Sequence, residues 1–370
     1  MKKGWQVDVL VNRLLGTRKL VGDGLSAVHR FRDTEENGLH VIRTVTLKLP
    51  GNEKRNIRRW ARRTLKCYRR YASRYGKPGL ILTHSVTWAG YAASLIAERN
   101  RMTEGHRIPF IIVEHRSYFV WSTEQARKMV KPFYLPLFEK AYRECARLVL
   151  VSPSLLTGLK ALMPWIEEKV MVIPNMIRED MFLPPAAPRK PDPFVILWAG
   201  RFDRVKGVDV LLKAVRILWE RTDKEFSVRL AGKGPLRQEM EQMAADLGVA
   251  GRMHFLGRLS REKIQEEMQA ASFFVMASRY EAFGAVLIEA MATGLPVIAT
   301  RSGGPDHIVT EQNGILVDPG EAGQLADAME RMMRNYPDYS GEQIRKSTME
   351  RYGESQVLEQ YSRLFRRFLQ

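Results

Sequence analysis

The stretch SRYEAFGAVLIEAMATGLPVIAT, residues 278–300, encodes a short apolar helix followed by a strand. Glu281 precedes the helix, which begins near Gly284, and Glu289 would lie roughly 12 Å from Glu281 if the segment were helical throughout. Two acids so far apart cannot share a proton, but they can hold two ends of an elongated ligand. Between them, the backbone N–H groups of Phe283, Gly284 and Ala285 would lie at a helix N-terminus, which suits a phosphate. A buried helix with two incidental glutamates remains the alternative for this segment alone.

Around this stretch, short apolar runs alternate with helical patterns, which is typical of βαβ units and parallel sheets. In the second half of the chain, the expected strands are residues 194–200, 227–232, 253–257, 271–278, 295–300 and 314–318. Helices are expected from about Glu321 onward. These elements predict a doubly wound α/β domain, whose ligands bind at the carboxyl ends of the strands.

The first strand of this domain leads directly into cationic residues. In AGRFDRVKG, residues 199–207, Arg201 and Lys206 follow the strand. Cations there suit a pyrophosphate, and arginine can bind it through two parallel hydrogen bonds. A solvated loop is the alternative for this pair in isolation. Glycine turns also follow later strands, at Gly232, in residues 255–260 and in residues 302–309.

The first half of the chain has the same alternation. Its expected strands are residues 7–11, 41–46, 80–83, 110–113, 148–151 and 170–173. Residues 184–193, PPAAPRKPDP, contain five prolines and are typical of a linker. The sequence thus predicts a domain over residues 1–183, a second over 194–348, and a C-terminal helix over 349–370 that returns toward the first domain. Two such domains would face one another across a cleft.

Together these segments resemble the GT-B glycosyltransferases, and specifically the large retaining family 4. The family signature of two glutamates separated by seven residues matches EAFGAVLIE, residues 281–289. The resemblance extends over nearly the whole chain and implies an α/β fold of two Rossmann-like domains. It also implies transfer of a sugar from a nucleoside diphosphate to a glycan or lipid-linked acceptor, in cell-envelope or exopolysaccharide synthesis.

The resemblance also implies roles for individual residues. Arg201 and Lys206 would hold the diphosphate and stabilise the leaving group, while Glu281 would contact the hydroxyls of the donor sugar and Glu289 those of the ribose. The backbone amides of Phe283, Gly284 and Ala285 would contact sugar or phosphate. Gly232, which follows the second strand of this domain, would line the donor site. The departing nucleotide carries negative charge, which fixed cations and helix dipoles stabilise.

The expected reaction needs no cofactor or divalent metal. The sequence has no DxD motif, and GT-B enzymes generally use basic side chains in place of a metal, so we expect metal-independent transfer with retention at the anomeric carbon. His307 stands where the family pattern has a glutamate. This substitution would change local contacts with the donor but not the class of enzyme that the resemblance implies.

The first half supplies candidates for the other side of the cleft. In IIVEHRSYF, residues 111–119, His115 follows a strand, and family members often have a histidine there that contacts the donor sugar near the reacting carbon. We therefore count His115 with Glu281, Arg201 and Lys206 as catalytic. His84 follows the preceding strand, and together with Arg116 and Ser117 it is expected to contact the acceptor. A structural role is the alternative for His84.

Charge is concentrated in the first half. The 370 residues have a net charge of +18, of which residues 1–180 carry +17. Residues 53–77 contain eleven Lys or Arg and one Glu, with aromatic residues at helical spacing. We expect a helix whose apolar stripe packs on the domain while cations from Arg55 to Arg74 face an anionic membrane. Nucleic acid is the rival partner, but no nucleic-acid-binding module is apparent.

Membrane spans, signal peptides and disulfides are not expected. No apolar run approaches 18 residues, Asp8 interrupts the apolar opening, and Cys67 and Cys145 are too few for a disulfide framework. The expected location is therefore the cytoplasm, peripheral on the inner face of the cytoplasmic membrane.

The opening KKGWQVDVLVN resembles a segment that family members place after a first strand and a glycine-rich loop. Lack of that strand would expose the edges of its neighbours and remove part of the site. The chain would then be an N-terminally shortened member with lowered or absent activity. A nucleotide-sugar-binding protein without turnover is thus the main alternative function, and a sugar-nucleotide epimerase is a weaker one.

Overall fold

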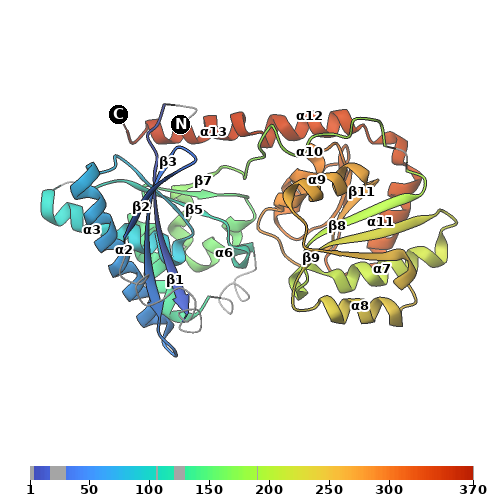
Figure 1. The fold of residues 1–370 in the computed structure, drawn as a ribbon, viewed down its shortest axis with the longest axis horizontal. Coiled ribbons are helices and arrows are strands. Elements are labelled where there is room, and N and C mark those ends of the chain that lie inside the picture. The colour runs from blue at the N-terminus through green and yellow to red at the C-terminus, as the bar shows by residue number, and fades with distance from the viewer. Residues whose placement is uncertain (1–3, 17–30, 106, 121–129, 190, 370) are drawn as a thin grey trace.

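The computed structural model describes residues 4–16, 31–105, 107–120, 130–189 and 191–369. Figure 1 shows two α/β halves side by side, with the last two helices running along one side of both. We call residues 4–183 the N-terminal half and residues 194–348 the C-terminal half. Residues 184–189 and 191–193 belong to the connection between them.

The C-terminal half is built on a six-stranded parallel sheet with the order β10-β9-β8-β11-β12-β13. The apolar runs of the sequence become these strands because both faces of the sheet are covered by helices, and β11 and β12 are buried along their whole length. The strands are β8 (Phe194–Arg201), β9 (Phe226–Lys233), β10 (Met253–Gly257), β11 (Phe273–Met276), β12 (Val297–Thr300) and β13 (Gly314–Val317). The helices are α7 (Val208–Arg221), α8 (Arg237–Asp246), α9 (Arg261–Ala270), α10 (Ala285–Ala292) and α11 (Ala322–Arg334).

The strands of the N-terminal half form two sheets. One is parallel, with the order β4-β5-β6-β7, and the other has the order β1-β3-β2, in which β1 and β3 are parallel. The strands are β1 (Asp8–Gly16), β2 (Arg32–Glu36), β3 (Leu39–Lys48), β4 (Ile81–His84), β5 (Phe110–Glu114), β6 (Arg147–Leu150) and β7 (Val170–Val172). Within the described ranges, β1 pairs only with β3 and β4 only with β5. Among the described residues, β1 and β4 therefore each lie at an edge of their sheet.

Strand β2 was not expected from the sequence. It pairs antiparallel to β3 through a turn in which Asn37 and Gly38 have φ angles of 51° and 73°. All five residues of β2 are exposed and none is apolar, so the strand has no hydrophobic alternation. Side-chain pairs across the hairpin, such as Arg43 with Glu36, stabilise it instead.

The N-terminal half is covered by α2 (Glu53–Tyr75), α3 (Tyr91–Glu104), α5 (Leu135–Glu144) and α6 (Leu155–Leu162). Helix α2 is amphipathic, as its spacing predicts. Its inner stripe, which includes Ile57, Ala61 and Tyr68, is buried. The Nδ2 group of Asn12 on β1 donates to the carbonyl of Trp60 at 3.0 Å, which ties the helix to that strand.

The chain returns to the N-terminal half through α12 (Gly341–Tyr352) and α13 (Glu354–Arg366), as Figure 1 shows. Ser355 donates to Glu179 at 2.6 Å, and Gly353 forms a β-bridge with Ile177. Leu364 is buried in a hydrophobic cluster that includes side chains of β5 and β6. The last helices therefore join the two halves.

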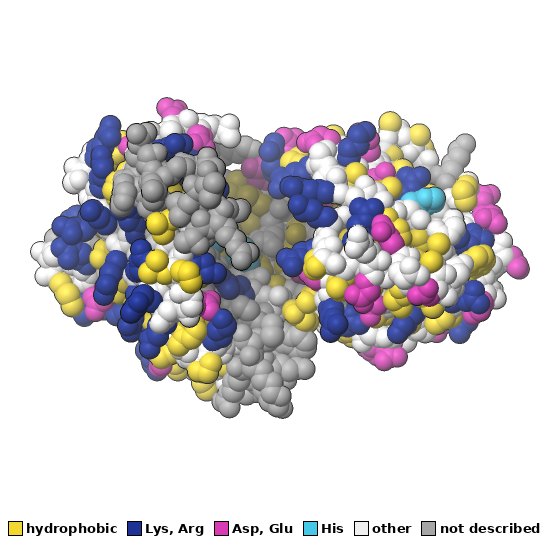
Figure 2. Space-filling view, turned by 60° about the horizontal axis from the view of Figure 1, so that its bottom comes forward, with side chains coloured by type: hydrophobic (Ala, Val, Ile, Leu, Met, Phe, Trp, Pro, Cys, Tyr) yellow, Lys and Arg dark blue, Asp and Glu magenta, His cyan; other side chains and the backbone are white. Residues whose placement is uncertain are grey.

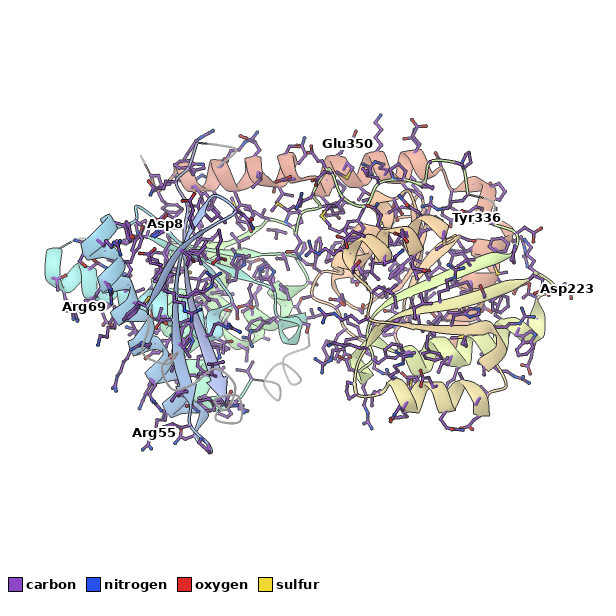
Figure 3. The ribbon with its side chains drawn as sticks, viewed as in Figure 1. Asp8, Arg55, Arg69, Asp223, Tyr336 and Glu350 are labelled. Carbon is purple, nitrogen blue, oxygen red and sulfur yellow. The ribbon has the colours of Figure 1, made fainter. Side chains whose placement is uncertain are left out.

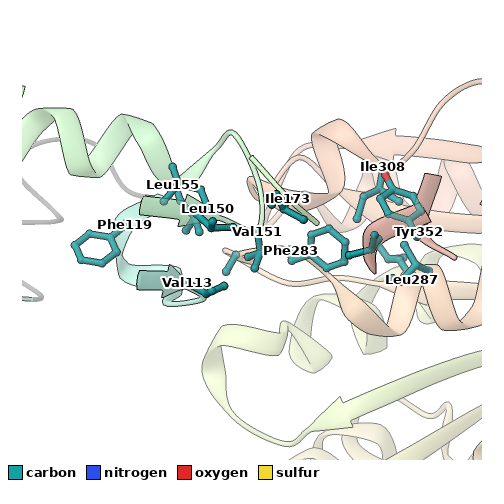
Figure 4. Close-up of a cluster of buried hydrophobic side chains, with 14 of the residues drawn as sticks. Val113, Phe119, Leu150, Val151, Leu155, Ile173, Phe283, Leu287, Ile308 and Tyr352 are labelled. Atoms are coloured by element: carbon teal, nitrogen blue, oxygen red, sulfur yellow. The ribbon is translucent and has the colours of Figure 1, made fainter. Parts of the chain in front are cut away.

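The halves also meet directly through apolar side chains. In Figure 4, Phe283 of the C-terminal half lies between Val151 and Ile173 of the N-terminal half and the Leu287 and Tyr352 side chains. Its ring packs edge-on against Tyr352, with centroids 5.8 Å apart. Phe283 therefore lies at the contact between the halves and is the first residue of the segment 283–285 that is expected to bind a phosphate.

Candidate active site

The loop after β8 holds its two candidate cations in a fixed turn. A single helical turn, η7 (Arg204–Lys206), starts at Asp203, whose carboxylate accepts from the N–H groups of Val205 and Lys206 at 3.1 and 3.3 Å. Gly207 ends the turn with a φ of 62°, and a Cβ there would lie 1.9 Å from the Ala277 carbonyl oxygen. Only glycine fits this position, so the loop after β8 is locked against the end of β11.

A second fixed loop follows β11. The N–H of Glu281 donates to the Ser302 carbonyl at 2.8 Å, and the N–H of Gly304 donates to the Glu281 carbonyl at 2.8 Å. Helix α10 then begins after Gly284, which has a φ of 97° and carries no side-chain cap. The helix starts later than a continuous helix from Glu281 would, so the sequence-based separation of the two glutamates does not apply.

The two loops meet through an ion pair. Lys206 Nζ lies 2.5 Å from Glu281 Oε2, with 28% and 16% of these side chains exposed. Arg201 Nε lies 3.2 Å from Asp203 Oδ2, but 69% of the Arg201 side chain is exposed. The structure thus brings Arg201, Lys206 and Glu281 to the carboxyl ends of β8 and β11, the edge at which such sheets bind ligands.

Gly232 lies beside these cations because β9 pairs with β8, which places Gly232 opposite Gly200. A Cβ at Gly232 would lie 1.8 Å from the Gly200 carbonyl oxygen. This position therefore requires glycine to keep the two strands paired up to Arg201.

Glu289 lies on α10, and it forms no ion pair with either candidate cation. Burial raises the pKa of Glu289 to about 7, against a smaller lowering by the nearby Arg261. The carboxyl group thus changes protonation near neutral pH. Either form can hydrogen-bond to a hydroxyl group of a ligand.

In the N-terminal half, the histidines that follow β4 and β5 are in contact. His84 Nδ1 lies 2.9 Å from His115 Nε2, and the rings stack with centroids 5.1 Å apart. Burial lowers the pKa of His84, and burial together with the neighbouring His84 lowers the pKa of His115 to about 4. Both imidazoles are therefore neutral at pH 7, so each has one donor and one acceptor nitrogen.

Arg116 and Ser117 lie next to this pair. Arg116 Nε donates to the hydroxyl oxygen of Ser85 at 2.6 Å, which links the loops after β4 and β5. Ser117 begins the short helix η4 (Ser117–Val120). A Cβ placed on Gly303 would lie 2.4 Å from a methyl carbon of Val120, so the end of η4 packs against the loop that holds Glu281.

Glu114 organises these two loops and was given no role from the sequence. Its carboxylate is fully buried and accepts from the N–H groups of Val86, His115 and Arg116, each at 3.1 Å, and from the Tyr142 hydroxyl at 3.2 Å. Burial raises its pKa, while the amides oppose this shift. The sequence signal was present, because a glutamate ends an otherwise apolar strand.

The structure forms two separate clusters of candidate residues. Lys206 meets Glu281, and His84 meets His115, but no hydrogen bond or ion pair among the described residues joins one cluster to the other. Figure 2 shows a hollow between the two halves. The candidates therefore lie on different halves of the molecule.

A cavity of about 550 Å³ lies at the contact between the halves, lined by Ser152, Phe283, His307 and Arg363 among others. His307 belongs to the short helix η9 (Gly304–His307), and its carbonyl accepts from Arg351 at 2.8 Å. The residue that departs from the family pattern thus lines this cavity. In the parts of the chain that the structure describes, no three acidic, histidine or cysteine side chains cluster to hold a metal.

Two family models match the chain. Residues 1–180 match the model described as Glycosyltransferase Family 4, and residues 182–351 match the model described as Glycosyl transferases group 1. The division between them falls next to the proline-rich segment 184–193. Together the two models cover nearly the whole chain.

Curated relatives match over part of their length. An uncharacterized glycosyltransferase of Methanocaldococcus jannaschii is 29% identical over 225 residues, which are 57% of each chain. The lipopolysaccharide core biosynthesis glycosyltransferase LpsE of Rhizobium meliloti is 36% identical over 140 residues, 38% of this chain and 39% of that protein. The matched residues thus span 57% and 39% of the lengths of these two relatives.

Solved structures match over most of the fold. Sucrose-phosphate synthase from Thermosynechococcus elongatus has a TM-score of 0.74 at 22% identity, over 99% of this chain and 90% of that one. The HepE protein of Anabaena, in complex with UDP, has a TM-score of 0.67 at 18% identity, over 87% and 86%. At these identities the likeness shows a shared fold, and it confirms the expected α/β architecture.

Proposed function

Since the chain belongs to the glycosyltransferases that combine the family 4 and group 1 domains in a GT-B fold, we propose that it transfers a sugar from a nucleoside diphosphate. The acceptor is a hydroxyl group of a glycan or of a lipid-linked molecule. The transfer retains the anomeric configuration, as the resemblance to family 4 implies, and it needs no divalent metal. Cell-envelope or exopolysaccharide synthesis is the proposed role.

The observation that carries this proposal is the meeting of Lys206 and Glu281 at the carboxyl edge of the six-stranded sheet, 2.5 Å apart. A diphosphate gains negative charge as the bond to the sugar breaks, and Lys206 and Arg201 are fixed cations that can stabilise it there. The uncapped start of α10 adds backbone N–H groups and the positive end of a helix dipole. These cations do the work that a metal ion does in other transferases.

The acceptor is proposed to bind on the side of the N-terminal half. The neutral histidine pair and Arg116 offer donors and acceptors suited to sugar hydroxyl groups. In this arrangement His115 contacts the donor sugar near the reacting carbon, and His84, Arg116 and Ser117 orient the acceptor. Glu114 positions both loops through its bonds to their backbone.

The comparisons favour a nucleotide donor and a cell-envelope role. HepE, which shares the fold, binds UDP and UDP-glucose, and LpsE acts in lipopolysaccharide core biosynthesis. We extend both properties to this chain as part of the proposal. The first experiment identifies the base of the nucleotide and the sugar that the donor carries.

The proposed partner of the N-terminal half is an anionic membrane surface at the inner face of the cytoplasmic membrane. Five exposed cations recur at helical spacing on the outer face of α2, at Lys54, Arg58, Arg62, Lys66 and Arg69. They span sixteen residues, roughly 22 Å of helix from the first to the last. In Figure 3, Arg55 and Arg69 point away from the body, and Figure 2 shows Lys and Arg gathered on this half. In the described residues, no helix is long and apolar enough to cross a membrane.

The first experiment is a thermal-shift screen of the purified chain against UDP-, GDP- and ADP-sugars, each with magnesium and with EDTA. We expect one nucleotide class to raise the melting temperature equally in both conditions. A shift that requires magnesium would contradict the metal-independent mechanism. No shift with any donor, from a folded protein, would contradict donor binding.

The second experiment measures hydrolysis of the bound donor, which separates an enzyme from a binding protein. Lys206→Ala and Glu281→Ala are each expected to lower turnover by roughly 100-fold or more, because each removes a group that stabilises the transition state. Lys213→Ala, an exposed lysine on α7, is the matched control and keeps full turnover. Unchanged turnover in both site variants would refute the placement of the site.

A further inference from the structure

Both cations assigned to the donor diphosphate are already paired with carboxylates in the structure. Lys206 is paired with Glu281, and Arg201 with Asp203. The two pairs differ in exposure, since 69% of the Arg201 side chain is exposed but only 28% of the Lys206 side chain. Exposed pairs contribute little free energy. A diphosphate must therefore compete chiefly with Glu281 for Lys206.

The backbone on each side of the Lys206–Glu281 pair is rigid. Glu281 is held by main-chain bonds to Ser302 and Gly304, and the turn that carries Lys206 is held by Asp203. The lysine side chain itself is flexible, with four methylene groups and an ammonium group that can change partner. Lys206 can thus leave Glu281 for a phosphate without any movement of the main chain.

We propose that Glu281 discriminates between the sugar donor and the free nucleoside diphosphate that remains after transfer, by taking Lys206 back once the sugar has left. The inference rests on the proposed function. When the donor is bound, the sugar hydroxyl groups donate to Glu281, and Lys206 is free to contact the diphosphate. When the sugar departs, the Glu281 carboxylate loses these partners beside a diphosphate of the same sign.

The nearest cation for Glu281 at that moment is Lys206, whose Nζ lies 2.5 Å from Glu281 Oε2 in the structure. Return of Lys206 to Glu281 removes a cation from the diphosphate. The loss of this cation weakens binding of the product. Glu281 therefore speeds release of the nucleotide in addition to holding the sugar.

The test uses calorimetric titration of the full-length chain with UDP, GDP and ADP. Glu281→Gln keeps the size of the side chain but cannot form an ion pair with Lys206. We expect this variant to bind the cognate nucleoside diphosphate roughly three- to tenfold more tightly than the wild type, while it transfers sugar more slowly. Added salt is expected to shrink the difference.

Glu311→Gln is the matched control, because it removes one negative charge from an exposed glutamate of the same half that is not paired with Lys206. It is expected to bind the nucleoside diphosphate no more tightly than the wild type. In the double variant Lys206→Ala/Glu281→Gln, affinity is expected to equal that of Lys206→Ala alone. That equality would show that Glu281 acts through Lys206.

Three results overturn the inference, and they differ from failure of the proposed function. Unchanged or weaker binding by Glu281→Gln, in a protein whose wild type binds a nucleoside diphosphate, would contradict the inference alone. Equal tightening by Glu281→Gln and Glu311→Gln would show that the effect comes from the net charge of this half and not from the Lys206–Glu281 pair. Absence of binding by the wild type with all three nucleotides would contradict the proposed function, and the inference with it.

Discussion

The two halves of the molecule reach an α/β fold in different ways. In the residues that the structure describes, the C-terminal half has one sheet of six strands, whereas the N-terminal half has seven strands divided between two sheets. Residues 181–370 carry a net charge of +1 and residues 1–180 carry +17. The candidate site follows the same division, with an ion pair on one side of the hollow and a neutral histidine pair on the other.

This difference shows how the two halves divide the proposed work. In the C-terminal half, glycines that admit no side chain fix two loops against one another, which suits binding of a small anionic molecule in one geometry. In the N-terminal half, a buried glutamate orders the loops near the hollow, while cations cover an outer helix. That half suits contact with a larger partner as well.

The largest predicted effect is the loss of stability when Glu114, which orders the loops of the N-terminal half, is replaced. Glu114→Ala leaves the N–H groups of Val86, His115 and Arg116 buried without an acceptor. We expect the free energy of unfolding to fall by about 3 kcal/mol. Urea unfolding followed by circular dichroism measures the change. Glu139→Ala, which removes an exposed glutamate of α5, is the control, and an equal loss in both variants would contradict the role of Glu114.

The second prediction tests the difference in charge between the two halves by measuring membrane binding. Arg58→Gln combined with Arg62→Gln should weaken sedimentation with vesicles of phosphatidylglycerol and phosphatidylcholine by about 30-fold, since each cation near such a surface adds roughly 1 kcal/mol. The control removes two exposed cations of the C-terminal half, Lys213→Gln with Arg221→Gln, and should leave binding intact. If RNA binding falls and vesicle binding does not, the partner is a nucleic acid.

A smaller effect concerns the pH dependence of the N-terminal half. The pKa of His115 is lowered to about 4, so between pH 6.5 and pH 4 the unfolded chain binds a proton there that the folded chain does not. Stability from this group is present above pH 6.5 and is lost as the pH falls through that window. Between pH 7 and pH 5 the melting temperature of the wild type should therefore fall, and that of His115→Gln should fall by a smaller amount. Equal curves for both proteins would contradict this.

The smallest effect has the opposite sign and belongs to the C-terminal half. The pKa of Glu289 is raised to about 7 from 4.5, so between those values the folded chain binds the extra proton and stability falls as the pH rises. Glu289→Gln should raise the free energy of unfolding by about 1 kcal/mol at pH 8 and leave it unchanged at pH 4. Thermal melts at the two pH values measure the difference. A gain of equal size at both pH values would point to packing instead.

Much of the C-terminal half could be predicted from sequence because its strands are buried on both faces. Runs such as residues 194–200 and 295–300 are mostly apolar, and each overlaps a strand of the structure. The polar strand β2 was missed because an exposed strand has no hydrophobic period. The signal that could have found it is the Asn37-Gly38 pair, which is typical of a two-residue hairpin turn.

The candidate site was predictable in its residues and less so in its contacts. Arg201, Lys206, Glu281 and Glu289 were selected from local motifs. Their pairing was not, because Lys206 and Glu281 are 75 residues apart, and their contact depends on β8 and β11 lying side by side. The same holds for His84 and His115, which are 31 residues apart on the neighbouring strands β4 and β5.

The sequence by itself determined the class of elements, the basic outer helix, and the glycines and charged residues that follow particular strands. These features depend on local periodicity and on turn chemistry, which a chain carries along its length. Only the tertiary structure decided that the N-terminal half has two sheets and that Glu114 holds two loops. It also decided that each candidate cation has a carboxylate partner. These are contacts between distant segments, which depend on how the strands are ordered and how the side chains pack.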